Sequence, residues 1–425
     1  MVTRASGTRT SSHGGFDCRT CGYEAARWFG RCPECGAWST AATRAVPSLA
    51  PPAAVASLAK SDGAPERRST GIAEVDRVLG GGLVDSSVVL LAGEPGIGKS
   101  TLVLQILAGA AAEGRSALLV TGEESIPQVA LRARRIGAAT DGIRVARATT
   151  LEEVLNACAT ERPELLVVDS IQTLEDSSVE SAPGSVTQVR ECAAALVAHA
   201  KATETVIVIV GHVTKDGGVA GPKTLEHVVD VVVALEGERH EDLRLLRVSK
   251  NRFGSCAETG VFVMNASGLD PVEDPSGMML GDRRPGIAGS VVFPSLEGTR
   301  PVLVEIQALV TPTKLVPPRR VALGVDARRL TLMLGVLSKS QKVRFGDHDV
   351  FVAVTGGLAV REPAGDLALC LALLSAIKEV RILPGIVAFG EVGLGGEVRR
   401  VPGPDRRLSE SARLGFDAAI VPAAC

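Results

Sequence analysis

The strongest chemical signal in the chain is a short glycine-rich stretch that ends in a lysine, a serine and a threonine. The pattern G-x-x-x-x-G-K-S is matched by Gly93, Glu94, Pro95, Gly96, Ile97, Gly98, Lys99 and Ser100, followed by Thr101. Backbone N–H groups of such a loop can surround phosphates, and the N-terminus of the next helix adds a partial positive charge. Lys99 would contact the β and γ phosphates, and the Ser100 hydroxyl would bind Mg²⁺. The pattern therefore predicts a site for ATP and Mg²⁺.

Hydrolysis of a triphosphate also needs a carboxylate on the metal side and a group that orients the attacking water. Asp169 ends the apolar run LLVVDS, at the sheet edge where ligands bind in open α/β sheets, so it is predicted to bind the metal. Glu123 follows the run SALLVTG and is predicted to be the general base, with Glu124 as the competing candidate. His212 ends TVIVIVGH, where it would contact the γ phosphate or act as a structural histidine.

Four of the nine cysteines form a cluster with metal-ligand spacing. Two C-x2-C pairs, separated by ten residues, are formed by Cys18, Cys21, Cys32 and Cys35. This spacing predicts a closed, structural zinc site with four thiolate ligands. Every Trp and the only Tyr of the chain lie in the same region, which holds Phe16, Tyr23, Trp28, Phe29 and Trp38. These aromatic side chains either form the small core of this module or stack on bases or on another chain.

The elements that position these residues require more than one domain, since a single core stops growing near roughly 250 to 300 residues and the chain has 425. Composition places a zinc module at 1–40, an Ala-, Pro- and Ser-rich linker at 41–68, a middle domain at 69–270 and a last domain at 288–425. Apolar runs alternate with helical stretches in the middle domain, which predicts an α/β fold whose mostly parallel sheet ends in antiparallel strands. The last domain is predicted to be α+β, with a strong helix near 366–379.

Charge and hydropathy narrow the class of protein. The net charge of −2, from 46 basic and 48 acidic residues, excludes a uniformly basic nucleic-acid coat. The segment 311–345 is the exception, because Asp326 is its only acid beside Lys314, Arg319, Arg320, Arg328, Arg329, Lys339, Lys342 and Arg344. It is either a site for a polyphosphate backbone or a solvated surface. With no apolar run near the roughly 20 residues of a spanning helix and no signal peptide, we expect a cytoplasmic chain without a membrane partner.

Several motifs in sequence order resemble one family of recombination ATPases. They are Ser69–Ile72 with Asp76, Gly80–Leu83, the glycine-rich loop and the five residues Lys250–Gly254, KNRFG. Over nearly its whole length the chain resembles the bacterial RadA (Sms) branch of the RecA-like ATPases. The resemblance implies an N-terminal zinc ribbon, a RecA-like P-loop ATPase core and a C-terminal Lon-protease-like domain. It also implies that Lys99, Ser100 and Asp169 hold phosphate and metal, and that Glu123 is the catalytic glutamate.

The same resemblance implies a DNA-dependent ATPase that binds single-stranded DNA as a homo-hexameric ring. Such an enzyme processes branched recombination intermediates by branch migration or unwinding, with recombinase or replication proteins as possible partners. Lys250 and Arg252 stand where the family presents basic fingers to the nucleotide of the neighbouring subunit, where a cation neutralises charge on the transferred phosphoryl group. The segments 174–190 and 213–224 stand where its DNA-facing loops lie, and Lys215 and Lys223 either contact phosphates or are surface lysines without a role.

The last domain allows a second reading of the chain as an ATP-dependent protease. It resembles the Lon peptidase domain around 361–366 and 390–408. Ala364, however, stands where Lon has its serine, and Asp405 stands where it has its lysine, so the nucleophile and its base are absent. Ser375 is out of register and is expected to pack. We therefore expect an inactive peptidase scaffold, reused for DNA contact and ring assembly. A third alternative is a DNA scaffold that binds nucleotide without hydrolysing it.

Overall fold

The structure, a computed structural model, describes residues 16–25, 27–43, 66–212, 222–237 and 242–423. The chain divides into two compact units, Met1–Ala64 and Pro65–Cys425. Among the described residues, no helix has both the length and the apolar character that crossing a membrane would require.

The first unit holds a small antiparallel sheet that carries the cysteine cluster. Its strand order is β2-β1-β3, made of β1 (Phe16–Cys18), β2 (Glu24–Ala25) and β3 (Ala41–Thr43). The N–H groups of Gly22 and Gly36 donate to the carbonyls of Cys18 and Cys32, each at 2.9 Å. Both glycines have a positive φ, which a side chain would strain. Each C-x2-C pair therefore bends into a tight knuckle.

The second unit begins with a nine-stranded sheet in the order β14-β13-β12-β11-β6-β10-β9-β7-β8. The strands from β11 to β8 in this order are parallel, whereas β12, β13 and β14 are antiparallel. This confirms the predicted α/β domain. Its strands are β6 (Val88–Gly93), β7 (Ala117–Thr121), β8 (Ile143–Arg147), β9 (Leu165–Asp169), β10 (Val206–His212), β11 (Val231–Glu236), β12 (Leu243–Asn251), β13 (Thr259–Asn265) and β14 (Gly268–Pro271), beside the short pair β4 (Arg67–Arg68) and β5 (Leu83–Val84).

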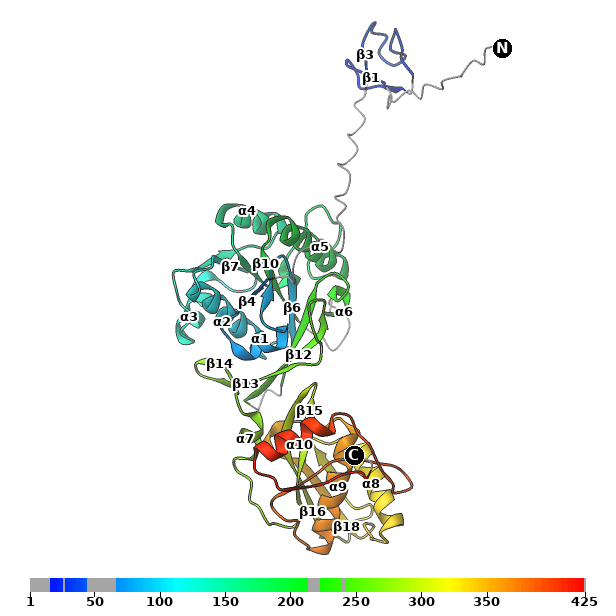
Figure 1. Cartoon of the computed structure of the whole chain (residues 1–425). Helices are drawn as coiled ribbons and strands as arrows, with labels where there is room; N and C mark the ends of the chain where they lie inside the picture. The colour runs from blue at the N-terminus through cyan, green and yellow to red at the C-terminus, as the bar shows by residue number, and fades with distance from the viewer. Residues whose placement is uncertain (1–15, 26, 44–65, 213–221, 238–241, 424–425) are drawn as a thin grey trace, which may run out of the picture. The chain divides into compact units, whose positions relative to one another are not determined.

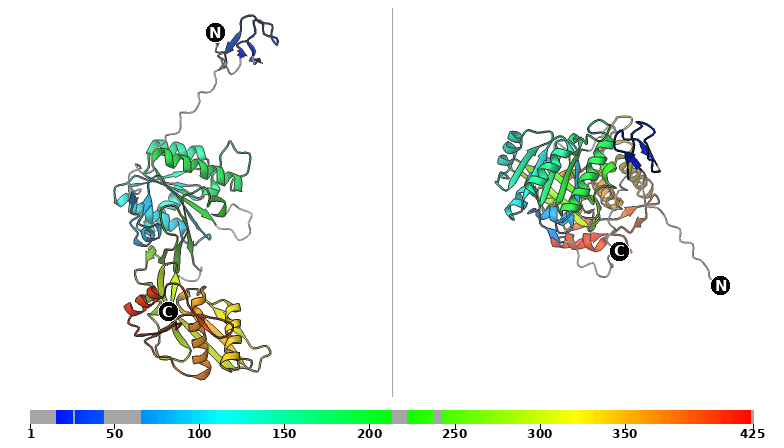
Figure 2. Two further views of the ribbon diagram at one scale, coloured as in Figure 1. Left: turned by 45° about the vertical axis from the view of Figure 1, so that its right-hand side comes forward. Right: turned by 90° about the horizontal axis from the view of Figure 1, so that it is seen from above.

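Alternating residues of the central strands face two separate apolar cores. Val89 and Leu91 face the core formed with α1, α2 and α3, and Val88 and Leu90 face the core formed with α4 and α5. The strands read as continuous apolar runs because helices cover both faces of the sheet, as Figures 1 and 2 show. The helices are α1 (Ala73–Leu79), α2 (Lys99–Ala112), α3 (Ile126–Arg135), α4 (Leu151–Glu161), the 3₁₀ turn η2 (Ile171–Thr173), α5 (Val186–Thr203) and α6 (Pro222–Leu225).

The rest of the second unit is built on a six-stranded mixed sheet in the order β17-β18-β16-β15-β19-β22. Helices α8 and α9 contribute to its main core, and α7 contributes Met279 to that core and Leu280 to the smaller core on the opposite face. The strong helix expected near 366–379 is α9. The strands are β15 (Ser290–Glu297), β16 (Arg300–Pro312), β17 (Arg320–Leu323), β18 (His348–Val354), β19 (Ile386–Ala388) and β22 (Ala418–Ile420), with the pair β20 (Glu391–Val392) and β21 (Val398–Arg399). The helices are α7 (Pro275–Leu280), α8 (Ala327–Ser340), η3 (Thr355–Gly357), η4 (Pro363–Gly365), α9 (Asp366–Lys378) and α10 (Pro404–Arg413).

Candidate functional site

The glycine-rich loop connects the end of β6 to the start of α2. Gly98 caps α2 with a φ of 117°, and Lys99 is the first helical residue. A Cβ on Gly98 would lie 2.4 Å from the Met264 side chain, and one on Gly93 would lie 2.7 Å from the Leu235 carbonyl oxygen. Both positions therefore exclude a side chain. The backbone N–H groups at the start of α2 have no partner within the helix, so they are available to an anion.

Lys99 and Ser100 occupy the first turn of α2. The Lys99 side chain is buried, and its Nζ donates to the carbonyl oxygens of Gly93 and Glu94, each at 2.9 Å. Burial lowers the pKa of Lys99, while the nearby carboxylates of Asp169 and Glu123 raise it. Thr101, the last residue of the predicted loop, is half-buried in the same turn. The ammonium is thus folded onto its own loop, ready to exchange backbone carbonyls for phosphate oxygens.

Three predicted site residues meet the loop at one edge of the sheet. Gly93 and His212 are register partners at the ends of β6 and β10, and Asp169 pairs with Thr121 at the ends of β9 and β7. Glu123 follows β7 by two residues, and its Oε1 lies 3.1 Å from His212 Nε2. Parallel strands deliver their carboxyl ends to a common edge, and this is where an open α/β sheet binds its ligand. The structure therefore brings together the residues that sequence placed on four separate strands.

Asp169 and Ser100 are placed for a magnesium ion. The Ser100 hydroxyl hydrogen-bonds to the Asp169 carboxyl. Burial raises the pKa of Asp169, against the lowering effect of that hydrogen bond. Hydroxyl and carboxylate oxygens are the ligands that Mg²⁺ prefers, so this donor pair fits the ion.

The two adjacent glutamates after β7 have different surroundings. The Glu124 carboxylate forms an ion pair with Arg132 of α3, and its N–H donates to the Thr121 hydroxyl. Glu123 instead accepts a hydrogen bond from Ser170 at 2.7 Å and contacts His212. Burial raises the pKa of Glu123, but the hydrogen bonds from Ser170 and His212 outweigh it and leave the pKa below its ordinary value. Glu123 is therefore the glutamate that faces the phosphate loop.

Lys250 and Arg252 lie at the opposite edge of the sheet. Lys250 pairs with Val232, in the part of β11 that lies beside the start of β6, whereas the phosphate loop follows the end of β6. Lys250 Nζ donates to the carbonyls of Glu226 and Val229, and Arg252 pairs with Asp230 at 3.2 Å. A six-residue strand spans about 20 Å. By this register Lys250 lies level with Leu90, about 10 Å before the end of β6, and Arg252 lies further away, beside Asp230.

The four clustered cysteines have the geometry of a zinc site. Their Sγ atoms all lie within 4.8 Å of one another, with Cys18 and Cys35 at 3.7 Å and Cys21 and Cys32 at 3.6 Å. A tetrahedral ion with zinc–sulfur bonds of about 2.3 Å separates its ligands by about 3.8 Å. A hydrogen bond with Thr40 lowers the pKa of the Cys18 thiol to about 6, whereas desolvation and the other cysteines raise the pKa of the Cys21 thiol. The donor set and its spacing fit a structural Zn²⁺.

Both sites lie in regions of the chain that match known protein families. The model of the AAA domain matches residues 62–218, and that of the rubredoxin metal binding domain matches residues 16–41. The DNA repair protein RadA of Bacillus subtilis is 45% identical over 96% of this chain and 92% of its own length. The proteins of that name from Pseudomonas aeruginosa and Escherichia coli are 47% and 46% identical with the same coverage. The chain belongs to the RadA family of DNA repair proteins.

Membership in the RadA family confirms the resemblance and the predicted architecture of a P-loop domain with a zinc ribbon. The aromatic residues of this ribbon divide into two groups. Tyr23 and Phe29 pack edge to face at 5.9 Å. Trp28 and Trp38 are 64% and 72% exposed, and the Arg31 guanidinium lies over the Trp38 ring. The tryptophans are therefore available for contact with a partner, whereas Tyr23 and Phe29 contribute to the small core.

The resemblance to RadA predicts that two segments, 174–190 and 213–224, face DNA. The structure describes the whole of the first segment but only the end of the second. Residues 174–190 follow η2 and carry three acidic side chains, Glu175, Asp176 and Glu180, against Arg190. This charge disfavours direct contact with phosphates through side chains. Of the second segment, Lys215 lies outside the described residues, and Lys223 lies in α6 without a described side chain. Lys215 and Lys223 stay predictions.

The basic segment of this RadA-family chain is partly neutralised by its own domain. Arg319 pairs with Asp349 and Arg329 with Asp366, while Arg320 donates to backbone carbonyls. Within the described part of the chain, five exposed cations of the segment form no hydrogen bond or ion pair, namely Lys314, Arg328, Lys339, Lys342 and Arg344. The surface charge is therefore smaller than the sequence count suggests.

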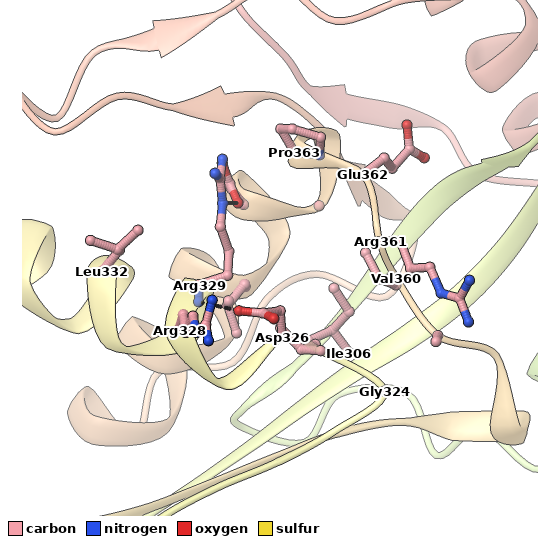
Figure 3. A pocket seen from close by; sticks show the side chains of 15 residues that line it. Ile306, Gly324, Asp326, Arg328, Arg329, Leu332, Val360, Arg361, Glu362 and Pro363 are labelled. Carbon is pink, nitrogen blue, oxygen red and sulfur yellow. Dashed lines mark hydrogen bonds and ion pairs between the residues drawn. The ribbon is translucent and has the colours of Figure 1, made fainter. Parts of the chain in front are cut away.

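A cavity of 690 Å³ lies in the C-terminal part, between α8 and the first Lon-like motif. Figure 3 shows Arg328, Arg329 and Leu332 of α8 near Val360–Pro363, which line the same cavity. None of its fifteen lining residues is a serine, threonine, cysteine or lysine. The cavity therefore lacks the groups from which a peptidase builds a nucleophile and its base.

The individual Lon-like positions agree with this chemistry. Ala364 is buried, and Asp405 is exposed in the first turn of α10. The Ser375 hydroxyl is buried, where it accepts from the Gly289 N–H at 2.8 Å and donates to the Val380 carbonyl at 2.5 Å. Ser375 thus links α9 to its neighbouring loops, and both of these partners are backbone groups.

Sequence reasoning missed two residues that contact the predicted machinery. Ser170 directly follows Asp169 and holds Glu123. Asp230 is buried immediately before β11, where it binds Arg252, Lys201 and the Val88 N–H. A lone aspartate inside the apolar run VVDVVV is a signal for Asp230, because a buried carboxylate requires partners. Nothing comparable distinguishes Ser170.

Proposed function

We propose that this chain is a DNA-dependent ATPase of recombinational repair that works as a homo-hexameric ring on single-stranded DNA. It processes branched recombination intermediates by branch migration or unwinding. The observation that carries this proposal is the placement of Lys99, Ser100, Asp169 and Glu123 at one sheet edge and of Lys250 and Arg252 at the other. A complete hydrolytic site then requires the cations of a second subunit.

Each residue has a defined part in this reaction. The loop 93–101 and Lys99 hold the phosphates, and Ser100 and Asp169 hold Mg²⁺, which shields the charge of the β and γ phosphates. Glu123 accepts a proton from the attacking water. Arg252 and Lys250 of the neighbouring subunit neutralise charge on the transferred phosphoryl group, an effect of about 10³ to 10⁵ in rate for such a finger.

The other two parts of the chain have supporting functions in this proposal. The names of the relatives support a role in DNA repair, and the zinc ribbon offers exposed Trp28 and Trp38 to a DNA or protein partner. The C-terminal domain, without a nucleophile in its cavity, is an inactive peptidase scaffold that contributes five exposed cations to DNA contact and ring assembly.

ATP turnover of the purified chain with and without single-stranded DNA tests the proposal. Turnover is expected to rise on addition of DNA, and Lys99→Ala is expected to abolish it, because the ammonium that contacts the phosphates is lost. Wild-type turnover that ignores DNA would favour a scaffold that binds nucleotide as a structural ligand. ATP-dependent cleavage of casein would instead favour the protease reading.

A further inference from the structure

One oxygen of Glu123 is held by two side chains from neighbouring strands. The Ser170 hydroxyl donates to Oε1 at 2.7 Å, and His212 Nε2 lies 3.1 Å from the same atom. Ser170 is fully buried, so its hydroxyl has no access to water as an alternative partner. His212 Nδ1 is buried and has no hydrogen-bond partner among the described residues. The hydrogen bond to Glu123 therefore fixes the imidazole ring.

These two contacts oppose the reaction expected of Glu123. A general base needs a free lone pair directed at the water and enough basicity to take its proton. Hydrogen bonds to a carboxylate stabilise its charged form and reduce its basicity, and here they bring the pKa of Glu123 below its ordinary value. They also direct Oε1 toward Ser170 and His212. In this arrangement Glu123 is therefore restrained and not ready to accept a proton.

We propose that Ser170 and His212 form a latch that restrains Glu123, and that hydrolysis becomes fast only when the Ser170 hydrogen bond is released. This inference rests on the proposed function, in which Glu123 is the general base. It assigns to Ser170 a regulatory role at the same site.

The latch is connected to a structured segment beyond the site. Ser170 precedes η2, and its carbonyl accepts from the Thr173 N–H at 3.2 Å and the Thr173 hydroxyl at 2.8 Å. A Cβ on Gly122 would lie 1.9 Å from that hydroxyl oxygen, so η2 packs directly on the backbone that precedes Glu123. A displacement of η2 would therefore change the distance between Ser170 and Glu123.

The segment after η2 is stiffened by one buried glutamine. Gln188 of α5 donates to the carbonyls of Asp176, Val179 and Ser181 at 3.0 to 3.1 Å and accepts from the Asp176 N–H. Residues 176–181 are thus fixed to α5 rather than independent of it. A neighbouring subunit that shifts this segment as the ring assembles on DNA would displace η2, and this is how we infer that the latch is released.

Ser170→Ala tests the latch, because it removes the donor and adds no bulk. Without DNA, its kcat is expected to exceed that of the wild type by about tenfold to a hundredfold, the range of one hydrogen bond to a charged group. KM for ATP is expected to stay unchanged, and the ratio of DNA-stimulated to basal turnover should fall. Ser267→Ala is the matched control, since its hydroxyl also donates at 2.7 Å to a side-chain oxygen, that of Asn265, but in an exposed turn.

A basal kcat that falls in Ser170→Ala, with an unchanged stimulation ratio, would show that Ser170 orients Glu123 productively and would overturn the latch. If Ser170→Ala does not fold, His212→Asn is the second test. It shortens the other side chain that contacts Glu123, so it is also expected to raise basal turnover. The measurements on the wild type distinguish the two proposals. A wild type that does not hydrolyse ATP refutes the proposed function, whereas a DNA-stimulated wild type with an unchanged Ser170→Ala basal rate refutes the latch alone.

Discussion

At the scale of single residues, the chemistry depends on which of two adjacent glutamates acts on the water. Sequence spacing left Glu123 and Glu124 both open, because each follows the same apolar strand. The structure distinguishes them by their partners, since Glu124 pairs with Arg132 of the next helix, whereas Glu123 contacts Ser170 and His212, which lie far away in sequence. Glu124 is thus engaged with α3, whereas Glu123 contacts His212 at the end of β10, beside the phosphate loop.

The matched substitutions Glu123→Gln and Glu124→Gln test this assignment. Glu123→Gln is expected to reduce kcat by about 10² to 10⁴, the usual contribution of a general base, while ATP binding is retained. Glu124→Gln should lose far less, because it breaks only a half-exposed ion pair with Arg132. Steady-state turnover and fluorescent-nucleotide binding measure the two effects. A larger loss in Glu124→Gln than in Glu123→Gln would reverse the roles.

At the scale of elements, the zinc ribbon provides its own spectroscopic probe. Both tryptophans of the chain, Trp28 and Trp38, lie between Phe16 and Thr43. A 40-residue module has too small a core to fold without its metal, and zinc supplies about 10 to 16 kcal/mol of binding energy to such modules. Tryptophan emission therefore reports on the ribbon, whereas far-ultraviolet circular dichroism reports mainly on the second unit.

Chelation of zinc should change these two signals differently. Tryptophan emission is expected to change as the ribbon unfolds, and readdition of Zn²⁺ should restore it. The thermal transition seen by circular dichroism should shift little, because Pro65–Cys425 has its own cores. Cys32→Ser, which removes a buried ligand, should give the chelated emission without chelator. Unchanged emission after zinc has been removed would contradict a metal-dependent fold.

Some of the helices, strands and loops could be predicted from the sequence, and others could not. The central strands were predictable because helices cover both faces, so Val88–Leu91 and their neighbours read as continuous apolar runs. The phosphate loop was predictable because only glycine fits at Gly93 and Gly98. The short helix α7 was not, since its Asp274 cap and Pro275 stand in a stretch that reads as a loop. The neutralisation of Arg319 and Arg329 was also hidden, because Asp349 and Asp366 come from other elements.

At the scale of the whole molecule, the register of β11 decides how the fingers can work. Sequence placed Lys250 and Arg252 in a family motif but could not say which edge of the sheet they occupy, because that follows from the pairing of β11 with both β6 and β12. Within one subunit these cations contact Asp230, Glu226 and Val229, which precede β11, whereas the end of β11 lies beside the phosphate loop. A ring built from head-to-tail interfaces would place the finger edge of one subunit against the pocket edge of the next.

This arrangement predicts that two inactive variants restore activity when mixed. Glu123→Gln subunits retain Arg252, and Arg252→Ala subunits retain an intact pocket, so about a quarter of the interfaces in a random mixed ring would be complete. Turnover of the mixture should clearly exceed the sum of the separate variants. A mixture of Glu123→Gln with Lys99→Ala is the control and should not recover, because both changes damage the pocket. Equal failure of both mixtures would show that Arg252 does not complete the site of a neighbour.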